Sequence, residues 1–322
     1  MSARMNCALA LTALLTACAP PIQRPDPLPQ PERVSPQQWA ADCTKWDKWD
    51  KPAPPYRIHG STYYVGTCGI SAILIAGEQG HVLIDSGTEA GAKVVLDNIG
   101  KLGFRPSEIA SLLHSHEHFD HTGGHALIKQ ASGAHVVASR RAVEVLRTGE
   151  SDPQDPQFGM HDAMEPVGVD VMVDDGDTVR SETATLTALA TPGHSPGALS
   201  WTWQSCDAAG DCLDIVYADS LSPVSSDDYR FADHPDYVAA YRAGLQTLRE
   251  VDCDLLLTPH PSASEMVERA ARGSHRQSGN SDWKGCRRIL SLVPRSSISS
   301  ASGPISGIGF SDPTWSKSPV RN

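Results

Sequence analysis

The segment that most constrains this chain is His116–His121, which reads His-Glu-His-Phe-Asp-His and directly follows a short apolar run at 110–113. We expect the apolar run to be a strand and the histidine segment to be the loop at its C-terminal end. There the three imidazoles and Asp120 can converge on one small volume. These ligand types suit Zn²⁺, and iron and manganese accept them too. The segment therefore predicts a metal site at the end of a buried strand.

Two later histidines stand in the same kind of place. His194 ends the segment Thr-Pro-Gly-His after an expected strand at 183–190, and His260 follows Thr-Pro after an expected strand at 254–258. Taken singly, each is as readily a plain loop histidine as a metal ligand. Taken with the His116–His121 segment, the two indicate one metal site assembled from three strand ends.

Short apolar runs alternate with helical patterns along the middle of the chain. Strands with interleaved helices, then consecutive strands, then a helix and a last strand predict a layered α/β domain with two sheets. The expected strands cover 71–76, 81–85, 110–113, 134–138, 183–190, 198–203, 213–218 and 254–258, and the expected helices cover 89–102, 123–130, 140–146 and 235–249.

In its three histidine segments the chain resembles the metallo-β-lactamase superfamily, whose signature is HxHxDH, a downstream TPGH and a late His. The resemblance covers about residues 55–290. It implies the metallo-β-lactamase fold, a four-layer αβ/βα sandwich, as a single catalytic domain. It also implies two zinc ions per chain. The first would be bound by His116, His118 and His194, and the second by Asp120, His121 and His260.

The segment 217–223 is similar to the third subclass of the class B β-lactamases. In that group a serine replaces the cysteine ligand of the other subclasses, which implies that Ser220 and Ser222 bind the substrate carboxylate. Read without the resemblance, both serines are ordinary turn residues. His116 and the late segment around His260 also agree with this subclass.

The function implied by the resemblance is zinc-dependent hydrolysis of the β-lactam amide bond of penicillins, cephalosporins and carbapenems, which would confer antibiotic resistance. A zinc-bound hydroxide, oriented by Asp120, would attack the carbonyl carbon. A secreted dizinc lactonase, thioesterase or esterase is the main alternative, and a catalytically silent zinc-binding lipoprotein is another. We interpret Asp219 as structural, whereas an Asp219 that bridges both metals would favour the lactonase.

The ends of the chain differ from its middle. Residues 1–17 resemble an export signal that ends in Leu-Thr-Ala before Cys18, either a lipobox or an ordinary signal with a chance cysteine. We expect a periplasmic protein, anchored to the outer membrane if Cys18 is acylated. A Pro-rich tether and N-terminal segment would span 18–50, the catalytic domain 51–290, and a Ser/Gly/Pro-rich, disordered tail 291–322 in place of the family's long closing helix.

The charge of the chain bears on its partners. With 27 Lys and Arg against 38 Asp and Glu, the formal net charge is −11. Nucleic acid is therefore not expected as a partner, because its phosphates need a basic footprint. We expect a monomer whose partner is a small β-lactam.

Six cysteines remain once Cys7 is removed with the signal and Cys18 is assigned to lipid. None is spaced like a zinc knuckle. Proximity and the pattern of the resembled family favour three disulfides, which are Cys43–Cys68, Cys206–Cys212 and Cys253–Cys286.

We expect all three bonds to form, because an exported chain matures where disulfides persist. A thiol titration of the denatured, unreduced protein should detect none of these six cysteines as a free thiol. Free thiols in the preparation would contradict the pairing.

Overall fold

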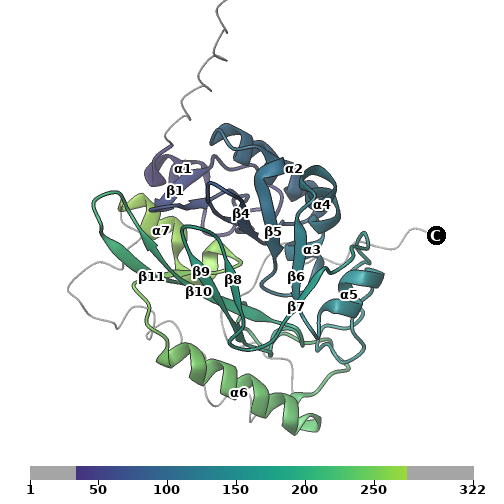
Figure 1. Ribbon diagram of the computed structural model, residues 1–322. Helices are drawn as coiled ribbons and strands as arrows, with labels where there is room; N and C mark the ends of the chain where they lie inside the picture. The colour runs from purple at the N-terminus through teal and green to yellow at the C-terminus, as the bar shows by residue number, and fades with distance from the viewer. Residues whose placement is uncertain (1–33, 274–322) are drawn as a thin grey trace, which may run out of the picture. The chain divides into compact units, whose positions relative to one another are not determined.

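Two sheets lie face to face in the computed structural model, which describes residues 34–273 (Figure 1). The first sheet has seven strands that follow one another in chain order. They are β1 (Tyr56–His59), β2 (Thr62–Tyr64), β3 (Ile73–Ile75), β4 (His81–Ile84), β5 (Ile109–Leu113), β6 (His135–Ser139) and β7 (Val171–Val173).

The second sheet has five strands in the order β12-β11-β10-β9-β8. Its members are β8 (Thr178–Arg180), β9 (Thr185–Ala190), β10 (Leu199–Cys206), β11 (Cys212–Tyr217) and β12 (Leu255–Leu257). This sheet is antiparallel from β8 to β11, and β12 joins β11 in parallel. The predicted two-sheet α/β architecture is confirmed.

Helices cover the outer faces of both sheets, as Figure 1 shows for α2, α4 and α6. The α-helices of residues 34–273 number seven, and they are α1 (Pro36–Asp42), α2 (Glu89–Lys101), α3 (Phe119–Thr122), α4 (His125–Ser132), α5 (Val143–Thr148), α6 (Pro235–Glu250) and α7 (Met266–Ala271). Val95 and Ile99 of α2 pack with Leu83 on the first sheet, and Leu248 of α6 packs with Val216 on the second. The layers are therefore helix, sheet, sheet, helix.

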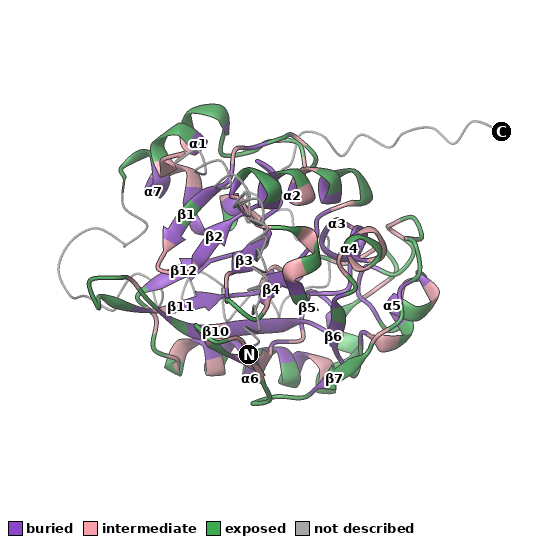
Figure 2. Cartoon of the chain, turned by 45° about the horizontal axis from the view of Figure 1, so that its top comes forward, coloured by how far each residue is buried: buried purple, intermediate pink, exposed green. Residues whose placement is uncertain are grey.

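Burial on both faces explains the near-continuous apolar strands. In β4 all four residues are buried, with Val82 and Ile84 in the core between the sheets and Leu83 under the helices. Figure 2 shows buried strands throughout the centre and helices that are buried along one side. Strands covered on both faces have no polar side to alternate with, so they read as apolar runs.

Strand direction places the loops that matter at one edge. In the first sheet β4 and β5 run parallel, and in the second β11 and β12 run parallel. Strand β9 also runs parallel to β11, because each is antiparallel to β10, which lies between them. The loops that leave the C-terminal ends of these strands gather at the facing edges of the two sheets, where the fold can build a site.

The N-terminal helix α1 is part of this core. Ser35 caps it, since its hydroxyl accepts the Gln38 N–H, and Trp39 is fully buried between Tyr56 and Tyr64. The Cys43–Cys68 disulfide joins the end of α1 to the loop before β3. The packed body therefore includes residues on the N-terminal side of the boundary expected at residue 51.

All the strands and helices expected from the sequence are present, with ends shifted by a few residues. The sequence did not predict β1, β2, β7 and β8, and it did not predict α1, α3 and α7. These strands have only three or four residues each, too few to establish a period. Helix α3 begins inside the His116–His121 segment, which was expected to be a loop throughout, and one helical turn is too short to show a period.

Two of the three expected disulfides, Cys43–Cys68 and Cys206–Cys212, are present. Cys253 is also disulfide-bonded, while its expected partner Cys286 lies outside the described residues. The signal segment, Cys18 and the tail lie outside them as well. Within residues 34–273 no helix has both the length and the apolar character needed to cross a membrane.

Trp39→Ala should lower the free energy of unfolding by about 3–5 kcal/mol, because it removes a fully buried indole from the core. Denaturant unfolding measures this change. Phe158→Ala is the matched control, since that ring is 50% exposed and its loss should cost within about 0.5 kcal/mol. Equal, small effects in both variants would show that α1 is not part of the folded core.

Candidate metal centre

Five strand ends supply the side chains of one buried cluster. Ligand-type residues follow directly on β4, β5, β9, β11 and β12 in the described part of the chain. In chain order they are Asp85, His116, His118, Asp120, His121, His194, Asp219 and His260, and all but His260 are buried. The sequence predicted the three histidine segments at this edge, and the structure brings them together.

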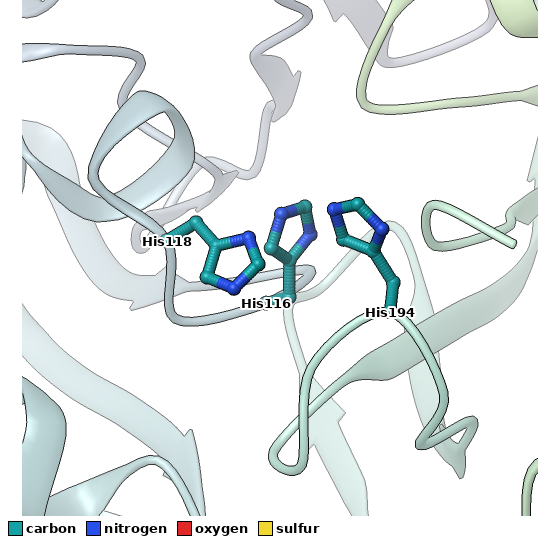
Figure 3. A group of neighbouring side chains, drawn as sticks. All are labelled: His116, His118 and His194. Carbon is teal, nitrogen blue, oxygen red and sulfur yellow. The ribbon is translucent and has the colours of Figure 1, made fainter. Parts of the chain in front are cut away.

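The first group consists of His116, His118 and His194. Each offers a ring nitrogen, and these nitrogens all lie within 4.8 Å of one another. The ring centroids of His116 lie 4.7 Å from those of both other rings, and the three rings stand side by side on two loops (Figure 3). Three imidazoles at this spacing can bind one metal ion.

The second group lies beside the first. Asp120 and His121 form a cluster with His116 whose ligand atoms again lie within 4.8 Å of one another. The Nε2 atom of His260 lies 3.4 Å from both His121 Nε2 and Asp120 Oδ2. All six ligands implied by the family resemblance therefore meet in two adjoining groups.

An oxygen atom holds the outer nitrogen of each imidazole in the first group. His116 Nδ1 lies 2.8 Å from Asp219 Oδ1, and His118 Nε2 lies 2.8 Å from Asp155 Oδ2. His194 Nδ1 lies 2.9 Å from the carbonyl oxygen of Ser222. Such partners fix the tautomer and ring orientation of metal-binding histidines.

The inner nitrogens face into the cluster, and that of His194 also lies 3.3 Å from the Gln157 amide nitrogen. His116 Nε2 is buried and makes no hydrogen bond with any described residue. A buried polar atom of this kind is costly unless something binds it. Together with the imidazole and carboxylate donor set, this atom fits a bound metal ion, and the donor types fit zinc.

The second group is held in a similar way. His121 Nδ1 lies 3.3 Å from Asp85 Oδ2. The Pro259 carbonyl, next to His260, accepts the Ser71 N–H at 2.7 Å, which ties the end of β12 to the loop before β3. The ligands of both groups therefore depend on neighbouring loops for their orientation.

Asp85 connects the two sheets below the site. Its carboxylate accepts the Ser115 N–H at 2.7 Å, the Ser115 hydroxyl at 2.8 Å and the Tyr217 hydroxyl at 2.7 Å. Asp85 adopts a φ of 62°, a conformation that non-glycine residues seldom take. The three hydrogen bonds hold it there, so the strained turn after β4 aims the carboxylate at His121.

The electrostatics favour neutral imidazoles at His116, His194 and His260. Burial and the neighbouring histidines hold the pKa of His116 well below its usual value, and they lower the pKa of His260 to about 4. Burial also depresses the pKa of His194. At His121 burial acts in the same direction, but the Asp120 carboxylate outweighs it and raises the pKa to about 10. At His118 burial is outweighed by the hydrogen-bonded Asp155 carboxylate, which raises the pKa. Neutral imidazole is the form that binds metals.

Asp219 and the two serines lie in the segment after β11, at the edge of the cluster. Asp219 is 1% exposed and lies against the outer nitrogen of His116, which agrees with its interpretation as structural. Ser220 is buried, and the Ser222 hydroxyl lies 3.4 Å from His194 Nδ1. Both serines therefore lie at the edge of the cluster, and their binding of a substrate carboxylate stays a prediction.

The loop 152–166 contributes residues that the sequence did not single out. Asp155 holds His118, and Gln157 Nε2 lies 3.3 Å from His194 Nε2. His161 Nε2 lies 3.2 Å from Gln157 Oε1, and its ring is 5.1 Å from that of His118. No period or motif marks these residues, because they lie in an irregular loop.

Residues 65–209 match the family model described as the metallo-beta-lactamase superfamily. Among solved structures, the MIM-2 metallo-beta-lactamase is 50% identical with a TM-score of 0.76, and the match covers 81% of this chain and 94% of that one. MIM-1 from Novosphingobium pentaromativorans is 44% identical with a TM-score of 0.75, over 80% and 93%. MEM-A1, a subclass B3 metallo-beta-lactamase from a soil metagenome library, is 37% identical with a TM-score of 0.71, over 76% and 93%.

Curated relatives match more distantly. A probable metallo-hydrolase of Burkholderia pseudomallei is 29% identical over 47% of this chain and 53% of its own length. A hydroxyacylglutathione hydrolase of Methylococcus capsulatus is 29% identical over 38% and 39%. The chain thus spans about half, or less, of the length of these curated relatives.

Tyr217→Phe should lower the free energy of unfolding by about 1–3 kcal/mol, because it deprives the buried Asp85 carboxylate of a hydrogen bond. Tyr237→Phe is the matched control, since its buried hydroxyl makes no hydrogen bond with any described residue. Denaturant unfolding of both variants makes the comparison. A Tyr217→Phe protein as stable as the Tyr237→Phe protein would contradict the role given to Asp85.

Proposed function

The chain belongs to the metallo-β-lactamase superfamily, and on that premise we propose that it hydrolyses the amide bond of β-lactam antibiotics with zinc as its cofactor. The observation that supports this proposal most strongly is the match to solved metallo-beta-lactamases, at 37–50% identity over about four fifths of this chain. The complete set of six clustered ligand residues supports an active centre rather than a silent one.

Two ions are proposed. His116, His118 and His194 would bind the first, and Asp120, His121 and His260 the second. Zinc at such a site supplies a water of lowered pKa and polarises a carbonyl oxygen, as catalytic sites with three protein ligands per ion do.

The protein's own residues would hold the imidazole rings in place and orient a water molecule. Asp219, Asp155 and the Ser222 carbonyl hold the outer nitrogens, so the rings need no rearrangement when a substrate arrives. Asp120 is 5% exposed and held beside His121 and His260, where its carboxylate can orient a water.

We propose that substrates bind where the loop 152–166 and the segment after β11 meet beside the cluster. The two contact each other through the Ser226 N–H, which donates to the Pro156 carbonyl at 2.8 Å. The hydroxyl groups of Ser220 and Ser222 would donate to the carboxylate that β-lactam antibiotics share. Ser222 is half-buried beside His194, which suits that role.

The position of Asp219 speaks against the lactonase and thioesterase alternatives. Asp219 Oδ1 lies 2.8 Å from His116 Nδ1, on the side of the ring opposite the Nε2 atom that faces the cluster, so the carboxylate is placed to orient His116 rather than to bridge two ions. The matches to hydroxyacylglutathione hydrolases cover less than half of the chain. The β-lactam proposal therefore explains more of the molecule.

Export to the periplasm is part of the same proposal. The disulfides Cys43–Cys68 and Cys206–Cys212 support it, because such bonds persist in oxidising compartments. Anchoring through Cys18 would follow if the segment before it is a lipobox.

Purified protein should hydrolyse a carbapenem and a chromogenic cephalosporin, and removal of metal with EDTA or dipicolinate should abolish the activity. Clavulanate should not inhibit, since the proposal involves no acyl-serine. A lactone and a thioester serve as control substrates and should not turn over. Turnover of the controls alone would favour the lactonase or thioesterase, and β-lactam hydrolysis by the metal-free protein would refute the role of zinc.

A further inference from the structure

Glu117 lies inside the histidine segment, yet its side chain faces away from the metal groups. It is 2% exposed, and its two carboxylate oxygens accept hydrogen bonds from the segment that carries His194. The Ser195 hydroxyl donates to Oε2 at 2.6 Å, and the Gly197 N–H donates to Oε1 at 2.7 Å. The residue between His116 and His118 therefore holds the residue after His194.

The contact is close and depends on a glycine. A Cβ atom on Gly197 would lie 2.7 Å from Glu117 Oε2 and 2.9 Å from the Ala142 nitrogen, so no larger residue fits without a shift. The Gly197 carbonyl in turn accepts the Ser139 hydroxyl at 2.6 Å. The turn after His194 is thus hydrogen-bonded to the Glu117 carboxylate on one side and to β6 on the other.

A backbone bond continues the same junction. The Leu199 N–H at the start of β10 donates to the Ser115 carbonyl at 2.6 Å. The segments 115–117 and 195–199 are therefore joined by three hydrogen bonds in a row. The segment 115–117 contains His116 and is followed by His118, and the segment 195–199 is preceded by His194.

The burial of Glu117 is otherwise unexplained. A carboxylate withdrawn from water costs free energy unless hydrogen bonds or a cation compensate for it. No Lys or Arg in residues 34–273 pairs with it, and burial together with Asp155 raises its pKa. The two hydrogen bonds to the His194 segment are the compensation that the described residues provide.

We infer that Glu117 is a positioning residue, which ties the His194 loop to the His116–His118 loop and so preassembles the first metal site. The inference rests on the proposed function, because it takes these three imidazoles as ligands of one ion. It concerns hydrogen bonds rather than charge. Glutamine should therefore replace glutamate, since its amide oxygen can accept the Gly197 N–H and the Ser195 hydroxyl can turn to accept from its amide nitrogen.

The test is a zinc titration of the metal-free full chain with a competing chelator, which yields the two dissociation constants separately. Glu117→Ala should weaken binding at one site by about 10–100-fold, as loss of a ligand's hydrogen-bonding partners does. The constant for the other site should stay as in the unmodified protein. Glu117→Gln should restore both constants, and Ser195→Ala, which removes only one of the two bonds, should lie between.

The controls separate positioning from general stability. Glu144→Gln changes an exposed glutamate on α5 and should leave both constants unchanged. The melting temperature of each metal-free variant shows whether it is folded. If Glu117→Ala does not fold, Ser195→Ala and Glu117→Gln still decide the question.

Each outcome has one meaning. Weakened binding at a single site with rescue by glutamine supports the inference. Unchanged constants in Glu117→Ala and Ser195→Ala overturn it, and so does a Glu117→Gln protein as weak as the alanine variant, because charge would then be the cause. An unmodified protein that binds no zinc would instead refute the proposed function.

Discussion

The constraint on which this centre depends is an oxygen partner at the outer nitrogen of each imidazole. His116, His118 and His194 are held by Asp219, Asp155 and the Ser222 carbonyl, three groups from separate parts of the chain. Because a neutral imidazole has one donor and one acceptor nitrogen, occupying the outer nitrogen as donor leaves the inner one as an acceptor for metal. The hydrogen bonds thus determine which atoms are available as ligands.

These partners lie on loops whose places are set by the packing of the two sheets. Asp85 leaves β4 of the first sheet and accepts the hydroxyl of Tyr217, which ends β11 of the second. Glu117 and Gly197 join the ends of β5 and β9 at the same edge. A shift of one sheet against the other would therefore separate the ligands, and the apolar core between the sheets keeps the centre assembled.

The sequence predicted the candidate metal-binding histidines because each of their segments follows a buried apolar run. Such runs are strands, and the C-terminal ends of these strands lie at the same edge of the fold. The sequence could not predict Asp155 or Asp85, since a chain with 38 acidic residues has carboxylates in most loops and none is marked as a histidine partner. The short strands β7 and β8 were also missed, because they are sheet edges with exposed residues and no period. Helix α1 was not predicted, because its burial depends on aromatic contacts with Tyr56 and Tyr64, distant in sequence.

Anomalous diffraction at the zinc edge from crystals of the zinc-loaded protein tests the central claim most directly, because it locates each ion relative to both nitrogens of every ring. The account predicts two zinc ions, one of them bound by His116 Nε2, His118 Nδ1 and His194 Nε2, with Asp219 and Asp155 still on the outer nitrogens. Zinc bound to an oxygen of Asp219, or to His116 through Nδ1, would contradict it.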